Sequence, residues 1–177
     1  MRKLSMDELN RPDIATFRNS GKIPVVVVLD NIRSFSNVGS IFRTADAFCI
    51  EAIHLCGITG CPPHREINKT ALGATETVSW KYFETINQSL IYLKQQHYSI
   101  IAVEQTTNSI PLTEIQWPTS LALVFGNEVE GVSYEALNLS DTIIEIPQNG
   151  TKHSLNVAVC AGIILWDSFK HFQYKIV

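Results

Sequence analysis

Short apolar runs alternate with polar, glycine-containing stretches along the chain, and they predict five buried strands. The first run holds only valine and leucine, which is typical of a strand buried on both faces of a parallel sheet. A weaker extended segment is predicted at Thr77–Tyr82. The five predicted strands are Val25–Leu29, Ala52–Cys56, Ser99–Val103, Leu121–Phe125 and Thr142–Ile146.

Helical patterns lie between these runs. After the first run, apolar residues recur at helical spacing at Val38, Ile41, Phe42 and Ala45. Further helices are predicted at Ile67–Leu72, Ile86–Gln96, Tyr134–Leu139 and Asn156–Phe172. Strands that alternate with helices pair in parallel through right-handed crossovers. We therefore expect an α/β fold, with a mostly parallel sheet and helices on both of its faces.

The last predicted helix is apolar on nearly every side, since residues 157–166 include no charged side chain. A terminal helix of a small domain cannot bury all its faces against one sheet, so we expect part of it to contact a partner. The alternative is a helix packed deep within its own chain.

A chain of 177 residues fits one domain of common size. Residues 1–24 are polar and predict an amino-terminal extension that Gly21 and Pro24 close, and residues 25–177 are expected to form a single domain. No apolar run approaches the ~18 residues needed to span a bilayer, and no apolar segment follows Arg2 and Lys3. We therefore expect a cytoplasmic protein with no membrane contact.

The four cysteines do not predict a metal site. Cys49, Cys56 and Cys160 lie in apolar runs, where a free cysteine behaves as a small hydrophobic residue. Cys56, Cys61 and His64 are close in sequence, but the chain has no CxxC pair and no second cluster. We expect no bound metal.

The net charge of −3 argues mildly against a general nucleic-acid binder, which is usually basic. Basic residues nevertheless occur within residues 1–24, around Arg65 and Lys69, and at Lys152 and His153, positions that could meet phosphates. Scattered lysines and arginines are equally typical of a solvated surface. Charge alone does not decide between these two interpretations.

The first of three polar motifs spans residues 29–45, LDNIRSFSNVGSIFRTA. Gly39 permits close backbone approach, and the start of the helix offers free N–H groups to an anion. Arg43 follows one helical turn later, and its planar guanidinium can clamp a phosphate or a carboxylate. In the alternative interpretation, Asn37 caps the helix and Arg43 forms a surface salt bridge.

The second motif, LVFGNEVEGVS at residues 123–133, places Gly126, Glu128 and Gly131 in one loop. A carboxylate between two glycines can accept hydrogen bonds from backbone N–H groups or from an arginine, and so fix a loop around a ligand. Alternatively, Glu128 and Glu130 are acidic residues that favour the start of the next helix, and we assign Glu130 to that role.

The third motif, IPQNGTKHSLN at residues 146–156, begins where Pro147 ends a strand. Ser154 and Asn156 both suit a helix cap, but one helix start needs one cap, so the other side chain is free to reach substrate. Gly150 and the following Thr-Lys resemble part of a phosphate loop, but Glu145 stands where that loop requires its first glycine. No GxGxxG follows any predicted strand either.

In this order, and each behind a predicted strand, the three motifs resemble those of the SpoU (TrmH) RNA 2′-O-methyltransferases of the SPOUT class. The resemblance covers roughly residues 25–169 and also includes Lys69–Ala74, which is similar to the family's loop after the second strand. It departs from the family at Asn127, Val129 and Gln148, which removes no proposed functional side chain. The matching residues are Asn37, Gly39, Arg43, Gly126, Glu128, Gly131, Pro147, Gly150, Ser154, Leu155 and Asn156.

The resemblance implies a deep carboxyl-terminal trefoil knot that binds S-adenosylmethionine without a metal. It also implies an RNA partner and a homodimer with the active site at its interface, which agrees with the apolar last helix. The implied cofactor-binding residues are Gly126, Ile146 and Leu155, with Val103 and Glu104 flanking the adenine.

The implied reaction transfers a sulfonium methyl group to a ribose 2′-hydroxyl in tRNA or rRNA. Arginine keeps its proton in proteins, so we expect Arg43 to clamp the phosphate and stabilise the developing alkoxide rather than act as a base. Ser154 and Asn156 are expected to orient the ribose, and Asn37 and Glu128 to hold Arg43 and the cofactor loop. The sequence assigns neither the proton acceptor nor the methylated nucleotide.

Two other functions remain open at this stage. One is an RNA-binding assembly protein that kept the fold and lost the chemistry, although the presence of Arg43, Glu128, Ser154 and Asn156 speaks against it. The other is an α/β enzyme acting on a small nucleotide. The acidic isoelectric point and the lack of an appended RNA-binding domain favour that possibility.

Overall fold

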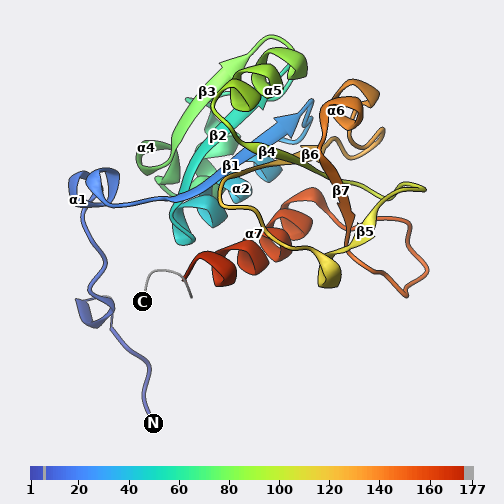
Figure 1. Ribbon diagram of the computed structural model, residues 1–177. Helices are drawn as coiled ribbons and strands as arrows, with labels where there is room; N and C mark the ends of the chain where they lie inside the picture. The colour runs from blue at the N-terminus through green and yellow to red at the C-terminus, as the bar shows by residue number, and fades with distance from the viewer. Residues whose placement is uncertain (6, 174–177) are drawn as a thin grey trace.

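The computed structural model describes residues 1–5 and 7–173, which build a seven-stranded sheet with helices on both faces (Figure 1). The strands are β1 (Ile23–Asp30), β2 (Ile50–Cys56), β3 (Ser79–Phe83), β4 (Ser99–Val103), β5 (Ile110–Pro111), β6 (Leu121–Gly126) and β7 (Thr142–Glu145). The α-helices are α1 (Ile14–Asn19), α2 (Phe35–Ala47), α3 (Arg65–Ala71), α4 (Ala74–Thr77), α5 (Ile86–Gln95), α6 (Tyr134–Leu139) and α7 (Val157–Gln173). Two 3₁₀ turns, η1 (Asp7–Leu9) and η2 (Leu112–Glu114), complete the described elements.

The strands lie in the order β3-β2-β1-β6-β4-β7-β5, and every neighbouring pair in the described chain is parallel. This confirms the predicted α/β class. Because the pairing is parallel, the carboxyl ends of all strands meet at one edge of the sheet, which is where α/β proteins bind ligands.

The central strand β1 is buried on both faces, as its unbroken aliphatic run predicts. Val25, Val27 and Leu29 belong to the core shared with α2, α3 and α7. Val26 and Val28 belong to a second core shared with α5 and α6. The helices thus divide into two layers, and α7 packs against α2 on the first of them.

The boundary of the amino-terminal extension differs from the prediction. Ile23 and Pro24 belong to β1, so the strand begins two residues earlier than expected. The register of β1 against β2 shifts between Ile23 and Val26, and the pairing with β6 starts only at Val25. Pro24, which has no N–H to donate, is tolerated at this irregularity.

Other differences are small. The predicted extended segment from Thr77 is divided, because Thr77 ends α4 and the strand β3 starts at Ser79. The strand β5 was not predicted, since Ile110 and Pro111 give too short a pattern to be distinguished from a loop. The predicted helices after the first motif, at 67–72, 86–96, 134–139 and 156–172, are confirmed to within about three residues at each end.

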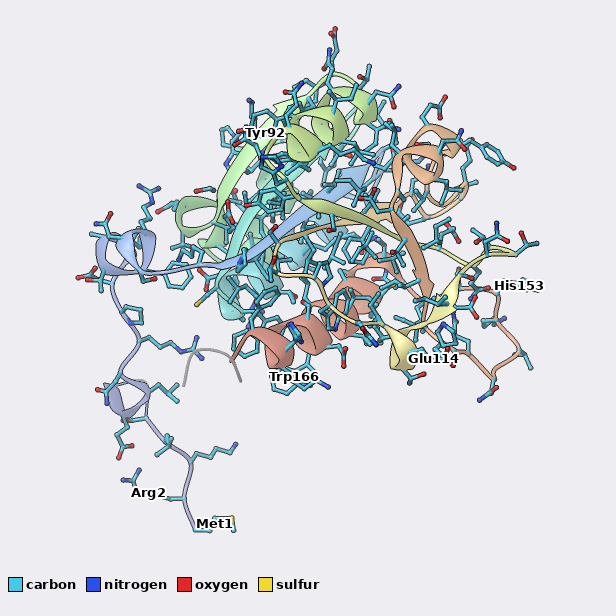
Figure 2. The ribbon with its side chains drawn as sticks, in the orientation of Figure 1. Met1, Arg2, Tyr92, Glu114, His153 and Trp166 are labelled. Atoms are coloured by element: carbon cyan, nitrogen blue, oxygen red, sulfur yellow. The ribbon has the colours of Figure 1, made fainter. Side chains whose placement is uncertain are left out.

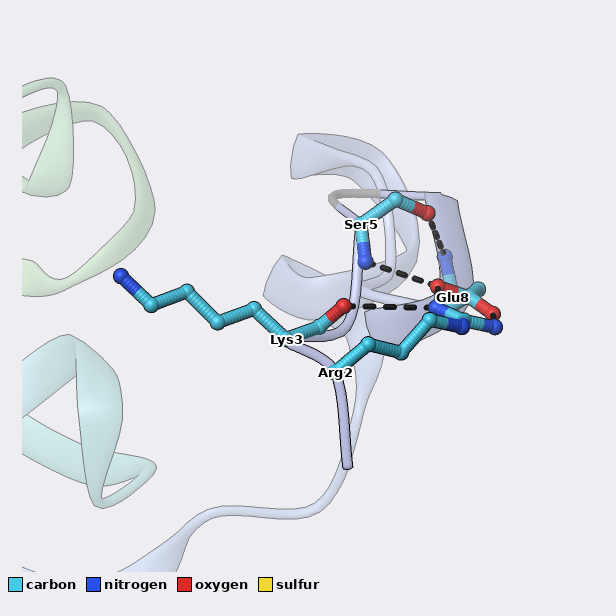
Figure 3. A network of polar contacts seen from close by, with 4 residues as sticks. All are labelled: Arg2, Lys3, Ser5 and Glu8. Atoms are coloured by element: carbon cyan, nitrogen blue, oxygen red, sulfur yellow. Dashed lines mark hydrogen bonds and ion pairs between the residues drawn. The ribbon is translucent and has the colours of Figure 1, made fainter.

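The amino-terminal extension runs away from the sheet, and its helix α1 is the part that contacts the body of the molecule (Figure 1). Arg18 Nε donates a hydrogen bond to the carbonyl oxygen of Glu76 in α4 at 2.5 Å. Further out, Arg2 and the Ser5 N–H both bond to the carboxylate of Glu8 (Figure 3). These bonds lower the pKa of Glu8 to about 2, Arg2 being the larger cause. An exposed network of this kind orders the segment locally and adds little to global stability.

Candidate active site

The three sequence motifs meet at the carboxyl edge of the sheet. In the register of the sheet, Asp30 at the end of β1 lies beside Gly126 at the end of β6. Val103 at the end of β4 lies between Phe125 on one side and Ile144 on the other. The loops of the first and second motifs therefore leave the neighbouring strands β1 and β6, and the loop of the third motif leaves β7, which β4 separates from β6.

Three side chains, one from each motif, form a continuous hydrogen-bonded chain. Asn37 Nδ2 donates to Glu128 Oε1 at 2.7 Å. Asn156 Nδ2 donates to Asn37 Oδ1 at 3.2 Å. The second carboxylate oxygen of Glu128 accepts a bond from the backbone N–H of Arg33 at 3.4 Å. We call Asn37, Glu128 and Asn156 the polar triad.

Glu128 is held as a carboxylate by this arrangement. Burial acts to raise its pKa, but the hydrogen bond from Asn37 and bonds from the backbone N–H groups of Arg33 and Ser34 outweigh burial and lower the pKa overall. The carboxylate thus fixes the start of α2 against the second motif, which agrees with the predicted acceptance of backbone N–H groups.

Capping roles at the two helix starts are now assigned. Ser34, not Asn37, caps α2, because its side chain accepts a bond from the Asn37 N–H. Asn156 caps α7, since its Oδ1 accepts bonds from the N–H groups of Ala158 and Val159 at 2.9 and 3.3 Å. Ser154 is exposed, and its side chain has no hydrogen bond in the described structure. It is the free member of the pair in the third motif.

Arg43 lies apart from the polar triad. It sits six residues after Asn37 on α2, about 9 Å further along the helix axis. Its side chain is exposed and forms no ion pair or hydrogen bond within the described residues. The expected contact of Asn37 and Glu128 with Arg43 is therefore absent, and so is the surface salt bridge of the alternative interpretation. Asn37 and Glu128 bond to each other instead.

The second motif folds into a tight loop closed by the mutual backbone bonds of Asn127 and Gly131, at 3.2 and 3.1 Å. A Cβ at residue 126 would overlap the carbonyl group of Gly131, so Gly126 lets the loop return onto its own strand. Gly131 has φ of +72°, a left-handed conformation that favours glycine, and a Cβ there would overlap the Glu104 carboxylate.

Glu104 is a brace for this loop. Its Oε2 accepts a bond from the Val132 N–H at 2.9 Å, and its Oε1 accepts one from the Gln105 N–H at 2.8 Å. The side chains of Val103 and Ile146 are half-buried and pack against the larger core. Leu155 is 38% exposed in the loop before α7. We call the predicted cofactor-binding residues the rim: Val103, Glu104 and Gly126 lie at the ends of the paired strands β4 and β6, Ile146 directly follows β7, and Leu155 precedes α7. Its side chains are apolar apart from one carboxylate.

Gly39 permits a close backbone approach, as predicted, and the backbone that it meets is that of α3. It is buried, and a Cβ there would overlap the Ile67 carbonyl and the Thr70 side chain of α3. Thr70 Oγ1 also donates to the carbonyl oxygen of Ser36 at 3.0 Å. Gly39 therefore allows α2 and α3 to pack closely.

Two residues at this edge were not predicted. Asp30 is buried, and its carboxylate accepts bonds from the Ser133 N–H at 2.9 Å and from Asn31 Nδ2 at 2.8 Å, which joins β1 to the start of α6. Thr59 is also buried; its hydroxyl donates to the Leu29 carbonyl and accepts from the Ile32 N–H. A carboxylate that ends an apolar strand directly before a loop was the available signal for Asp30.

A sequence profile of the SpoU rRNA Methylase family matches residues 24–166. The chain belongs to this family. Membership confirms the resemblance drawn from the three motifs. The part of the chain that the structure describes contains no group of three His, Cys, Asp or Glu side chains able to hold a metal ion. No helix among the described residues is long and apolar enough to cross a membrane.

Members of known activity and structure extend the comparison. The chain is 31% identical over 144 residues to a tRNA (guanosine(18)-2′-O)-methyltransferase of Thermus thermophilus, covering 81% of this chain and 73% of that one. The TrmH/SpoU tRNA modifying enzyme of A. aeolicus superposes with a TM-score of 0.82 at 27% identity, covering 92% of this chain and 83% of that one. An AdoMet-bound rRNA methyltransferase from Sinorhizobium meliloti superposes with a TM-score of 0.78 at 26% identity, and the match covers 88% of this chain and 60% of that one. The SPOUT fold of the SpoU family is thereby confirmed, and it implies the predicted knot.

Proposed function

We propose that this protein transfers the methyl group of S-adenosylmethionine to a ribose 2′-hydroxyl of tRNA or rRNA. The observation that carries the proposal is the polar triad, which joins all three family motifs at the carboxyl edge of the sheet. The similarity to 2′-O-methyltransferases named for tRNA, and to an rRNA methyltransferase, supports the class of substrate. Because tRNA and rRNA occur in the cytoplasm, either substrate supports a cytoplasmic location for the enzyme.

The residues of the rim fit the cofactor. Apolar side chains of Val103, Ile146 and Leu155 suit the planar adenine, and the Glu104 carboxylate suits a cationic group. Gly126 and Gly131 keep the second-motif loop close to the strand, so that backbone groups rather than side chains face the ligand. When bound, S-adenosylmethionine supplies a methyl group on a sulfonium that is already a good leaving group.

The polar side chains position the other reactant. Asn156 and the free hydroxyl of Ser154 orient the ribose, and Asn37 and Glu128 fix Asn156 and the start of α2. Arg43, exposed and without a partner in the described structure, is available to bind the phosphate next to that ribose and to stabilise the developing alkoxide. Because arginine keeps its proton, the proton acceptor is another group.

The functional unit is a homodimer with the active site at its interface. The support is an apolar stripe on α7, formed by Val159, Ile163 and Trp166, which are 53%, 38% and 50% exposed. Trp166 projects from α7 away from the sheet (Figure 2). These positions are four and three residues apart, so they line one face of the helix. An apolar face of this kind is typical of an interface between subunits.

The test is methyl transfer from isotope-labelled S-adenosylmethionine to unfractionated tRNA and to purified rRNA, followed by mass-spectrometric mapping of 2′-O-methylated nucleosides. We expect label in one nucleotide of one RNA class, and calorimetric binding of the cofactor. Cofactor binding without transfer would indicate a non-catalytic RNA-binding protein. Transfer to a free nucleotide but not to RNA would indicate a small-nucleotide enzyme. Either result contradicts the proposal.

A further inference from the structure

Two aromatic rings stack at the start of α2, the helix that also carries Asn37. The rings of Phe35 and His64 have centroids 3.8 Å apart and planes inclined by 16°. Phe35 is 39% exposed although it is a large apolar residue, and His64 is half-buried. The pair therefore presents aromatic surface to solvent.

The stack is held rigidly. Phe35 is the first residue of α2, directly after the cap Ser34, so its backbone is fixed by the helix. A Cβ at Gly60 would overlap the Phe35 ring, so this glycine leaves room for the ring against the loop after β2. His64 caps α3, and its Nδ1 accepts a bond from the Glu66 N–H at 3.3 Å. The His64 ring is thus tied to the start of α3, and the Phe35 ring lies between it and the loop that contains Gly60.

The stack and the proposed ribose site share the first turn of α2. Phe35 and Asn37 are two residues apart in the first turn of α2, so their Cα atoms are about 5 Å apart while their side chains leave the helix in different directions, Phe35 towards His64 and Asn37 towards Glu128. Arg33, the residue whose N–H bonds to Glu128, precedes the stack in sequence, and Arg65 follows His64. Both arginine side chains are exposed, and neither forms an ion pair in the described structure.

From this juxtaposition we infer that the Phe35–His64 stack is a platform for a nucleobase, either that of the methylated nucleotide or that of its immediate neighbour in the RNA. Exposed aromatic surface flanked by cations without an ion-pair partner is the combination with which proteins bind unpaired nucleotides, the rings stacking on bases and the arginines meeting phosphates. In the single chain, part of the Phe35 side chain is exposed to solvent, and a bound nucleobase would cover it. The inference rests on the proposed function and adds to it that the target nucleotide is bound with its base unpaired.

The test separates stacking from a structural role. Phe35→Leu keeps an apolar side chain and removes the ring, whereas Phe35→Trp keeps an aromatic face. Tyr92 is the matched control: it is 40% exposed on α5, on the other face of the sheet from α7 (Figure 2). Each variant and the wild type are assayed for methyl transfer to the unfractionated tRNA and rRNA at one stated salt concentration, for RNA affinity, for S-adenosylmethionine affinity and for melting temperature.

Phe35→Leu is expected to weaken RNA binding roughly 5- to 150-fold, the range found for removal of one base-stacking side chain. Its cofactor affinity should stay within about twofold. Phe35→Trp should retain transfer, and RNA should quench the fluorescence of the added indole beyond the quenching of the three native tryptophans. Tyr92→Leu should leave RNA affinity unchanged, and Tyr92→Trp should add no quenching.

The outcomes distinguish the platform from the proposed function. If the wild type methylates RNA but Phe35→Leu binds it equally well, the platform is wrong and the proposed function stands. If Phe35→Leu loses cofactor affinity and melting temperature together with RNA affinity, and the added indole is not quenched, Phe35 is a structural residue and the platform is wrong. If the wild type transfers no methyl group to RNA, the proposed function is wrong, and the platform, which rests on it, is wrong as well.

Discussion

Asn156 uses the two ends of its amide for two purposes: Oδ1 caps α7 through the Ala158 N–H, and Nδ2 donates to Asn37 across 119 positions of sequence. Substitution can separate these purposes. Asn156→Asp keeps the cap and loses the donor, so we expect stability near that of the wild type and a marked loss of methyl transfer. Asn156→Ala should lose transfer and about 1 kcal/mol of stability. Chemical denaturation and initial rates measure both effects, and full activity of Asn156→Asp would show that the bond to Asn37 has no functional role.

Arg43 is expected to be essential for the reaction and dispensable for the fold. Arg43→Ala should abolish methyl transfer, leave cofactor affinity within a few fold and leave stability unchanged, because the side chain is exposed and makes no bond in the described structure. Arg43→Lys should also be poor, since lysine lacks the bidentate guanidinium. Arg11→Ala, in the amino-terminal extension, is the control for loss of one exposed arginine. Retention of most of the activity by Arg43→Ala would contradict the clamp.

The apolar stripe of α7 predicts the effect of a charge at Ile163. Because Ile163 is 38% exposed in the single chain, Ile163→Glu should leave the subunit folded. In a dimer interface the same charge would be buried without a partner, which costs several kcal/mol, so the dimer should dissociate and lose activity. Analytical ultracentrifugation compares it with Ile91→Glu, a control on α5 at a position 49% exposed. A wild type that sediments as a monomer at micromolar concentration would rule out the homodimer.

Stability should fall in mild acid because of His54. Burial, and secondarily the charge of Lys81, lowers the pKa of this histidine from 6.5 to about 4, and its Nδ1 is 2.8 Å from the Ser89 hydroxyl. Below pH 6.5 the unfolded chain binds a proton that the folded chain does not, so stability declines as pH falls towards 4. About 2 kcal/mol should be lost between pH 7 and pH 5. Urea unfolding at several pH values should show that stability declines less steeply with falling pH in His54→Asn than in the wild type. Parallel curves for the two proteins would contradict the role of His54.

The sequence predicted those parts of the fold that depend on local pattern. The run Val25–Leu29 marks a strand because each of its faces is buried, and Asn156 follows the ordinary chemistry of helix caps. What depended on sheet order could not be predicted. Asp30 reaches Ser133 only because β1 lies beside β6, and Gly39 meets Ile67 only because α3 packs across α2. The two-residue strand β5 exists through its pairing with β7 rather than through any pattern of its own.

The same sheet order determines how copies of this protein can meet. The two outer strands of the sheet are β5 and β3. In β5, Pro111 lacks a backbone N–H, and β3 is short and carries Lys81 at its centre. A proline and a central lysine both oppose the addition of a further strand from another molecule. Growth of the sheet into fibrils is therefore disfavoured at both ends. The proposed dimer instead uses the helix surface of α7, which two subunits can share without leaving an open strand for a third.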